Sequence, residues 1–245
     1  MLLDAIASPA DLRRLDAAQL PALAEEIRTF IVESVAANGG HLGSNLGVVE
    51  LTLALHRVFD SPHDRILWDT GHLAYVHKLI TGRRAGFAAL RQEGGLSGYP
   101  NRAESEHDWI ENSHATTALS YAHGLAMAED LRLEAARRHG ERAHRREVVA
   151  VIGDGALTGG MAYEALNNLG HSGRKAIIVL NDNGRSYAPT VGRLTGSVSR
   201  LRLDPRYLRQ RRRAEEIVRQ VPMVGQHVAW GLAGARAGLR EMLEP

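Results

Sequence analysis

The sequence contains no cysteine among its 245 residues. Disulfide scaffolds, thiolate zinc sites, iron–sulfur clusters and cysteine nucleophiles are therefore excluded. Aromatic residues are also scarce, at 5% of the chain, whereas 44% of the residues are hydrophobic. A chain of this length can bury a hydrophobic core without disulfides or a structural metal. We expect an ordinary globular fold, suited to a reducing compartment.

Long apolar runs and a strong charge of one sign are missing as well. No run approaches the roughly 18 apolar residues that span a bilayer, and Met1-Leu2-Leu3-Asp4 lacks the basic start of a secretion signal. The formal net charge is only +2. Arginines concentrate at residues 200–213, where Tyr207 alone could stack on a base, so we interpret this stretch as an exposed helix face or loop. These features predict a soluble, cytoplasmic protein with no nucleic-acid or membrane partner.

Apolar patterning alternates between strands and helices along the chain. Continuous β-branched runs at residues 147–152 and 175–180 predict buried strands, and a helical period separates them. This alternation is typical of an α/β fold with a parallel sheet that helices cover on both faces. We expect one domain over residues 1–245, with a helical part at about 1–60, a sheet-forming core at about 61–200 and C-terminal helices at about 204–245. The other predicted elements are helices at 22–37, 46–58, 115–136 and 160–169, a strand at 65–69 and a long loop at 94–111.

Each predicted strand ends in a polar segment. These segments are Asp69-Thr70-Gly71-His72, Gly153-Asp154-Gly155-Ala156 and Asn181-Asp182-Asn183. Ligands of open parallel sheets bind beyond the carboxyl ends of the strands. The second segment offers backbone N–H groups before a helix, which suits a phosphate, and Asp154 and Asn183 carry the oxygen ligands that Mg²⁺ prefers. The sequence therefore predicts a metal–diphosphate site.

These segments belong to a series of motifs that runs in order through the chain. The series comprises GGHLGSNLG at 39–47, WDTGHLAYVHK at 68–78, GLSGYP at 95–100, ESEHD at 104–108, NSHATT at 112–117 and GDGALTGGM at 153–161. Together the motifs closely resemble the 1-deoxy-D-xylulose-5-phosphate synthase family of transketolase-like enzymes. The resemblance implies a thiamine-diphosphate-binding fold, with thiamine diphosphate and Mg²⁺ as cofactors.

The resemblance also implies roles for the polar segments. Asp154, Asn183 and the backbone carbonyl of Arg185 match the family's Mg²⁺ ligands. Gly155 and Ala156 match residues that donate backbone N–H groups to the diphosphate, and Gly153 belongs to the same cofactor-binding turn.

Three histidines match family positions along the reactive part of the cofactor. His41 matches a histidine that handles protons near the reactive thiazolium carbon, with Ser44 close to it in sequence. His72 and the segment Ser113-His114-Ala115 match residues that lie along the thiazolium and diphosphate. We therefore take His41, His72 and His114 as candidate catalytic residues. His77-Lys78 is a weaker candidate, as a phosphate contact.

In the family's reaction, pyruvate loses carbon dioxide and the remaining two-carbon unit is transferred to glyceraldehyde 3-phosphate. Family chains are more than twice as long as this one, and the part without a counterpart here binds the aminopyrimidine ring. The resemblance therefore implies a chain that is inactive alone and is completed by a separate pyrimidine-binding chain or by self-association. Leu73, Ser113 and Ala115 differ from residues found in many members, so the donor and acceptor stay open.

Three interpretations stay open at this point. The chain could be one component of a split synthase, or of a transketolase-like enzyme with a different donor or acceptor. It could be a non-catalytic paralogue that binds the cofactor, or the full-length enzyme, and acts as a regulator or interaction module. It could also be a truncated form of a longer enzyme. The retained polar residues at the strand ends favour the first and third interpretations, because an interaction module has no need of them.

Overall fold

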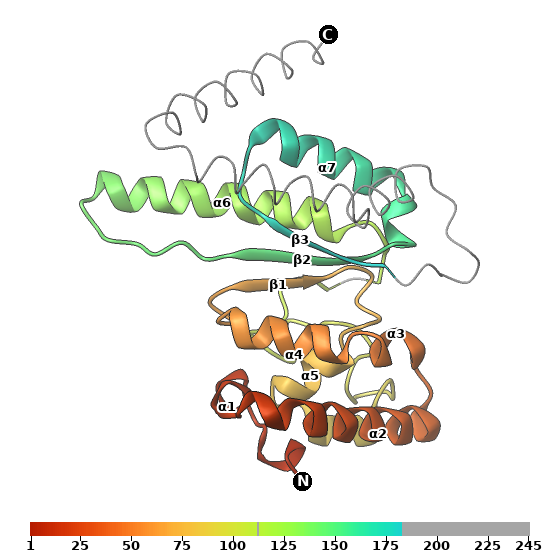
Figure 1. Cartoon of the computed structure of the whole chain (residues 1–245). Coiled ribbons are helices and arrows are strands. Elements are labelled where there is room, and N and C mark those ends of the chain that lie inside the picture. Colours follow the sequence, from red (N-terminus) through yellow and green to blue (C-terminus); the bar gives the residue numbers. More distant parts are fainter. Residues whose placement is uncertain (112, 183–245) are drawn as a thin grey trace, which may run out of the picture. The chain divides into compact units, whose positions relative to one another are not determined.

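The computed structural model describes residues 1–111 and 113–182 (Figure 1). All of these residues lie in one compact unit, Met1–Val191. The helices expected at about 204–245 lie outside the described residues, so a single domain over the whole chain stays a prediction. Among the described residues, no helix is both long and apolar enough to cross a membrane.

A parallel sheet of three strands forms the centre of this unit. The strands are β1 (Arg65–Trp68), β2 (Val148–Gly153) and β3 (Ile177–Asn181), in the order β1-β2-β3. Both pairings are parallel, with Trp68 opposite Val151 and Gly153 opposite Asn181. The predicted α/β class and parallel sheet are confirmed. The register also brings the polar ends of β2 and β3 to the same edge.

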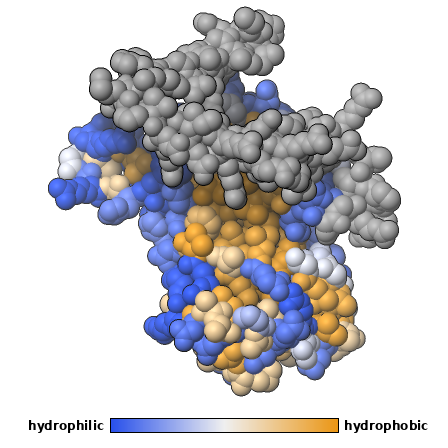
Figure 2. All heavy atoms as spheres, in the orientation of Figure 1, coloured by the Kyte–Doolittle hydropathy of each residue, from blue (hydrophilic) through white to orange (hydrophobic). Residues whose placement is uncertain are grey.

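Helices cover both faces of the sheet (Figure 1). On one face, α6 (Ala118–Arg138) and α7 (Gly160–Ser172) pack on Leu67, Ala150 and Ile152. On the other face, α4 (Val49–Val58) packs on the alternate side chains of the same strands. Successive strand residues point to opposite faces, so residues 66–68 of β1 and 148–152 of β2 are all apolar. Figure 2 shows hydrophobic residues gathered in the middle of this view of the molecule.

A second helical layer lies beyond α4. It contains the long helix α2 (Leu20–Asn38) and the short helices α1 (Pro9–Arg14), α3 (Gly43–Leu46) and α5 (Tyr75–Ile80). Their apolar side chains form a core with those of α4. Single 3₁₀ turns complete the described elements, at Leu3–Ala5, Ala17–Gln19, Arg84–Ala89 and Ala156–Thr158.

Each helix and strand predicted within the described residues occurs, and two helices begin later than predicted. The strand expected to be buried at 175–180 is β3, which is only partly buried. The helix expected at 46–58 is divided into α3 and α4, with Gly47 between them. The helix expected at 115–136 begins only at Ala118, because Thr116 has a positive φ of 74°. The long loop expected at 94–111 is confirmed.

Candidate functional site

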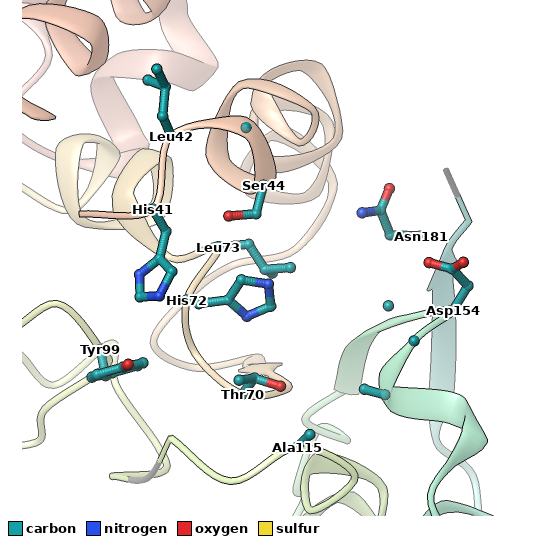
Figure 3. A pocket seen from close by; sticks show the side chains of 14 residues that line it. His41, Leu42, Ser44, Thr70, His72, Leu73, Tyr99, Ala115, Asp154 and Asn181 are labelled. Carbon is teal, nitrogen blue, oxygen red and sulfur yellow. The ribbon is translucent and has the colours of Figure 1, made fainter. Parts of the chain in front are cut away.

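A cavity of about 700 Å³ opens at the carboxyl ends of the strands (Figure 3). Several turns meet around it, which is where ligands of open parallel sheets bind. Its lining comes from residues 41–44, from residues 70, 72 and 73 after β1, from residues 153–156 at the end of β2, and from Tyr99, Ala115 and Asn181. The cavity thus joins chain segments from both helical layers and from the sheet.

One side of the cavity carries side chains with oxygen atoms. Asp154 follows β2, is only 4% exposed and lines the cavity together with Asn181 at the end of β3. The backbone N–H of Asp154 donates to the carbonyl oxygen of Asn181 at 3.1 Å, so the register of the sheet fixes their proximity. Figure 3 shows the carboxylate of Asp154 and the amide of Asn181 side by side. The predicted ligands Asn183 and Arg185 lie outside the described residues.

The turn after β2 packs tightly against the segment before α6. A Cβ atom placed on Gly159 would lie 2.1 Å from Cγ2 of Thr116, so only glycine fits there. Thr116 is fixed from the other side by Asp69, whose Oδ1 accepts the Thr116 N–H at 2.9 Å. The other carboxylate oxygen accepts the N–H of Ala118 at 3.0 Å. Asp69 therefore sets both the start of α6 and the path of the chain beside the cavity.

The segment held by Asp69 contains three predicted cofactor-binding residues, and only one of them lines the cavity. Ala115 is part of the lining, whereas Ser113 and His114 are exposed beside it. The other predicted residues, with Asn183 and Arg185 set aside, do meet at the cavity: His41, His72, Gly153, Asp154, Gly155 and Ala156. The roles of all these residues stay predictions.

The His41 and His72 rings lie next to each other on the side of the cavity opposite Asp154 (Figure 3). Their ring centroids are 5.6 Å apart, with the planes at 72°. Nδ1 of each ring is buried and has no hydrogen-bond partner among the described residues. Buried polar atoms are normally paired, so each ring keeps one polar atom whose hydrogen bond the described residues do not supply.

Both histidines are held in the neutral form near pH 7. Burial lowers the pKa of His41, and the charge of Arg91 lowers it further. Burial also lowers the pKa of His72. The charge of His41 lowers it further, and this effect is larger than the opposing effect of the Asp69 charge. A neutral imidazole can accept a proton at one nitrogen and donate one from the other. The pair is therefore suited to moving protons inside the cavity.

Tyr99 was not identified from the sequence. Its ring centroid lies 5.8 Å from that of His41, and it lines the cavity from the long loop. Hydrogen bonds hold the loop on either side of it: the N–H of Ser97 donates to Glu104 at 2.6 Å, and that of Asn101 donates to Asp108 at 2.7 Å. Two carboxylates therefore fix the segment that presents Tyr99.

These two carboxylates are themselves held by buried cations. Lys78 is fully buried and donates to Glu104. Arg83 donates to both oxygens of Asp108, at 2.6 Å and 2.9 Å. His77, also fully buried, donates from Nε2 to Asp108 at 2.9 Å. The interpretation of His77-Lys78 as a phosphate contact is wrong, because both side chains are fully buried and bind the carboxylates of Asp108 and Glu104.

The oxygen ligands for a metal are incomplete within the described residues. No group of three or more His, Asp or Glu side chains gathers there around a common point. Asp154 supplies a carboxylate at the cavity, and Asn181 supplies an amide oxygen from the neighbouring strand. Mg²⁺ commonly takes only one or two protein carboxylates and fills its other positions with water and phosphate oxygens. The side chains at the cavity therefore fit a magnesium–phosphate ligand.

Comparison with known proteins gives one consistent answer. The family model described as 1-deoxy-D-xylulose-5-phosphate synthase matches residues 3–245. Proteins of that name from Mycobacterium tuberculosis (strain ATCC 25618 / H37Rv) and Mycobacterium bovis (strain BCG / Pasteur 1173P2) are 58% identical to the chain over 245 residues. The protein of that name from Mycobacterium avium (strain 104) is 57% identical. Each alignment covers 100% of this chain and 37% of the relative.

Proposed function

Because the chain belongs to the 1-deoxy-D-xylulose-5-phosphate synthase family, we propose that it forms the diphosphate-binding component of a thiamine-diphosphate enzyme. The reaction we propose is decarboxylation of pyruvate and transfer of the two-carbon unit to glyceraldehyde 3-phosphate. The observation that carries the proposal is the cavity itself, in which a carboxylate and a strand-end turn lie opposite two neutral histidines. A different donor or acceptor on the same scaffold is the second candidate.

Asp154 would hold Mg²⁺, and the backbone of the turn after β2 would hold the diphosphate. We propose Asn183 and the carbonyl of Arg185 as further metal ligands, and the N–H groups of Gly155 and Ala156 as donors to the phosphate oxygens. Without a cation between them, the Asp154 carboxylate and a phosphate would repel each other, so Asp154 would need Mg²⁺ to sit beside the diphosphate. The Asn181 amide, which lines the cavity beside Asp154, would complete this polar end.

The bound cofactor would supply the electron sink for breaking and forming carbon–carbon bonds. His41 and His72 would manage the protons, since burial keeps each imidazole neutral and able to accept one. The unpartnered Nδ1 of each ring gives it a free hydrogen-bonding atom among the described residues. We propose His114 as a third residue of this group and Ser113 as a cofactor-binding residue. Both are exposed in the segment that leads to Ala115, which lines the cavity.

The chain spans 37% of the length of the curated relatives that it matches. We propose that the rest of the active site, including the pocket for the aminopyrimidine ring, lies in the part of the relatives that this chain does not cover, carried by a second polypeptide, by an associated chain or by the remainder of a longer protein. The chain would then bind the diphosphate end of the cofactor and be inactive alone. Buried cavities that bind cofactors commonly lie between domains, which fits this division.

Reconstitution tests the proposal. This chain is mixed with a candidate chain that carries the pyrimidine-binding part, and carbon dioxide release from pyruvate is followed with thiamine diphosphate and Mg²⁺ present. We expect release only from the mixture, and only with both cofactors. Release from neither the mixture nor the separate chains, together with no cofactor binding by calorimetry, would overturn the proposal. Cofactor binding without any release would favour a non-catalytic, regulatory paralogue.

A further inference from the structure

The amide of Asn45 joins the two turns that carry the cavity histidines. Asn45 lies in α3 and is fully buried. Its Nδ2 donates to the carbonyl oxygen of His41 at 2.6 Å and to that of His72 at 2.8 Å. The two histidines are separated by 30 intervening residues in the sequence, yet one side chain binds the backbone of both.

The remaining atom of this amide is also used. Oδ1 of Asn45 accepts the N–H of Tyr75 at 2.9 Å. The hydroxyl of Tyr75 in turn accepts the N–H of His41 at 3.3 Å. His41 is therefore held at both its N–H and its carbonyl by a closed set of hydrogen bonds. An amide with both hydrogens and its oxygen engaged has a single orientation.

The backbone of the first turn leaves little alternative to this arrangement. Gly40 has a φ of 140°, and a Cβ atom placed there would lie 2.6 Å from the hydroxyl oxygen of Tyr75. The backbone at Gly40, just before His41, therefore lies directly against the hydroxyl group of Tyr75. Tyr75 is fully buried in the second helical layer, so the turn rests on a fixed surface and Asn45 closes it from the other side.

The geometry points to Asn45 as a positioning residue that sets the separation and orientation of the His41 and His72 rings. This inference rests on the proposed function for its chemical meaning, because two rings 5.6 Å apart can share a ligand only while their turns keep this spacing. Asn45 itself does not line the cavity, so it acts through the backbone of the two histidines. Its two donors also satisfy two carbonyls that would otherwise lie unpaired beside each other, which is costly in a buried position.

Asn45→Asp is the informative variant, because it is nearly isosteric. The new carboxylate still accepts the N–H of Tyr75, but it cannot donate to either histidine carbonyl and it repels both. The matched control is Asn38→Asp. Asn38 also donates from Nδ2 to two carbonyl oxygens, those of Ser34 at 3.2 Å and Phe87 at 3.1 Å, and neither belongs to a cavity residue.

The readout is the nuclear Overhauser effect between the ring protons of His41 and His72, measured on the full chain with labelled histidine. We expect the effect in the wild type and in N38D, and its loss in N45D, with far-UV circular dichroism unchanged. Retention of the effect and of both histidine chemical shifts in N45D would overturn the inference. If N45D does not fold, Asn45→Ala is measured in the same way, since it removes the donors without introducing a charge.

A second measurement separates this inference from the proposed function. Binding of thiamine diphosphate with Mg²⁺ is measured by calorimetry for the same three proteins. We expect affinity about tenfold weaker in N45D and unchanged in N38D, from the loss of two buried hydrogen bonds. If the wild type binds no cofactor but N45D still loses the contact between the rings, the proposed function fails and the positioning role stands. If N45D binds the cofactor as well as the wild type does and keeps the ring contact, the positioning role fails alone.

Discussion

Nε2 of His77 lies 2.9 Å from Oδ1 of Asp108, and both side chains are completely buried. On its other side, Nδ1 of His77 lies 2.9 Å from Nε2 of His56, which is also fully buried. Burial lowers the pKa of His77 to about 4, even though Asp108 opposes this shift. Both histidines are therefore neutral near pH 7. His56 then donates to His77 and His77 donates to Asp108, because a carboxylate can only accept.

The stability of the fold should depend on these buried histidines at mildly acidic pH. The pKa of His77 is about 4 in the folded chain and about 6.5 in the unfolded chain. The unfolded state therefore binds more protons between these values, and stability present above pH 6.5 is lost as the pH falls toward 4. The expected loss from His77 alone is about 3 kcal/mol. Urea unfolding of the wild type and of His77→Gln at several pH values measures it, and equal pH slopes for the two proteins would contradict the assignment.

Neighbouring arginines provide a matched test of the buried network. Arg83 pairs with Asp108, whose side chain is 0% exposed, whereas Arg84 pairs with Asp4, whose side chain is 50% exposed. Replacing Arg83 leaves a buried carboxylate without its cation, which typically costs about 3–5 kcal/mol. An exposed pair contributes about 1 kcal/mol or less. We expect Arg83→Ala to lower the free energy of unfolding by several times more than Arg84→Ala does, and equal losses would show that the network does not stabilise the fold.

Two adjacent glycines should differ sharply in what they tolerate. A Cβ atom on Gly159 would meet Thr116 at 2.1 Å, whereas a Cβ atom on Gly160 meets nothing within 4 Å. Gly159 has an ordinary φ of −77°, so the cost of an alanine there is steric and should be about 1–3 kcal/mol. Gly160→Ala should change stability by no more than about 0.5 kcal/mol. Thermal or urea unfolding of the two variants compares them, and a tolerated Gly159→Ala would mean that the turn after β2 does not pack on Thr116.

The pKa of His41 should respond to Arg91. Burial is the larger cause of its lowered pKa, and the positive charge of Arg91 is the second. Arg91→Gln removes that charge, so the pKa of His41 should rise toward its usual value while staying below it. Titration of the His41 ring protons by NMR measures the change. Arg28→Gln removes a partly buried arginine that pairs with the exposed Glu50. It is the control and should leave the His41 titration unchanged, and an unchanged titration in Arg91→Gln as well would refute the assignment.

The fold was predictable where the local pattern decided it. The apolar run of β2 is buried on both faces, as its pattern predicts, whereas β3 is only partly buried and Ile178 is 38% exposed. The parallel sheet and its polar strand ends followed from these two runs. The start of α6 did not follow, because it is set by Asp69, which binds the N–H groups of Thr116 and Ala118 from a distant part of the chain. A helical pattern in the sequence carries no information about such a distant contact.

The site was predictable to a similar extent. The turn after β2 and the two glycine–histidine turns carry recognisable residues, and they do meet at the cavity. The pattern does not indicate Tyr99, because its loop has no periodicity. It does not indicate that Lys78 is buried either, because a lysine is rarely buried and its partner Glu104 is distant in the sequence. Both outcomes depend on Glu104, which binds Lys78 and the N–H of Ser97. Only the assembled structure brings these residues together.

The proposed metal–diphosphate site is tested most directly by calorimetry with three ligand conditions. Thiamine diphosphate with Mg²⁺, thiamine diphosphate with a chelator, and thiamine with Mg²⁺ are each titrated into the wild-type chain and into Asp154→Asn. We expect the wild type to bind only when both the diphosphate and Mg²⁺ are present, and the variant to bind at least about tenfold more weakly. Binding that survives the chelator or the loss of the Asp154 carboxylate, or no binding by the wild type in any condition, would contradict the account.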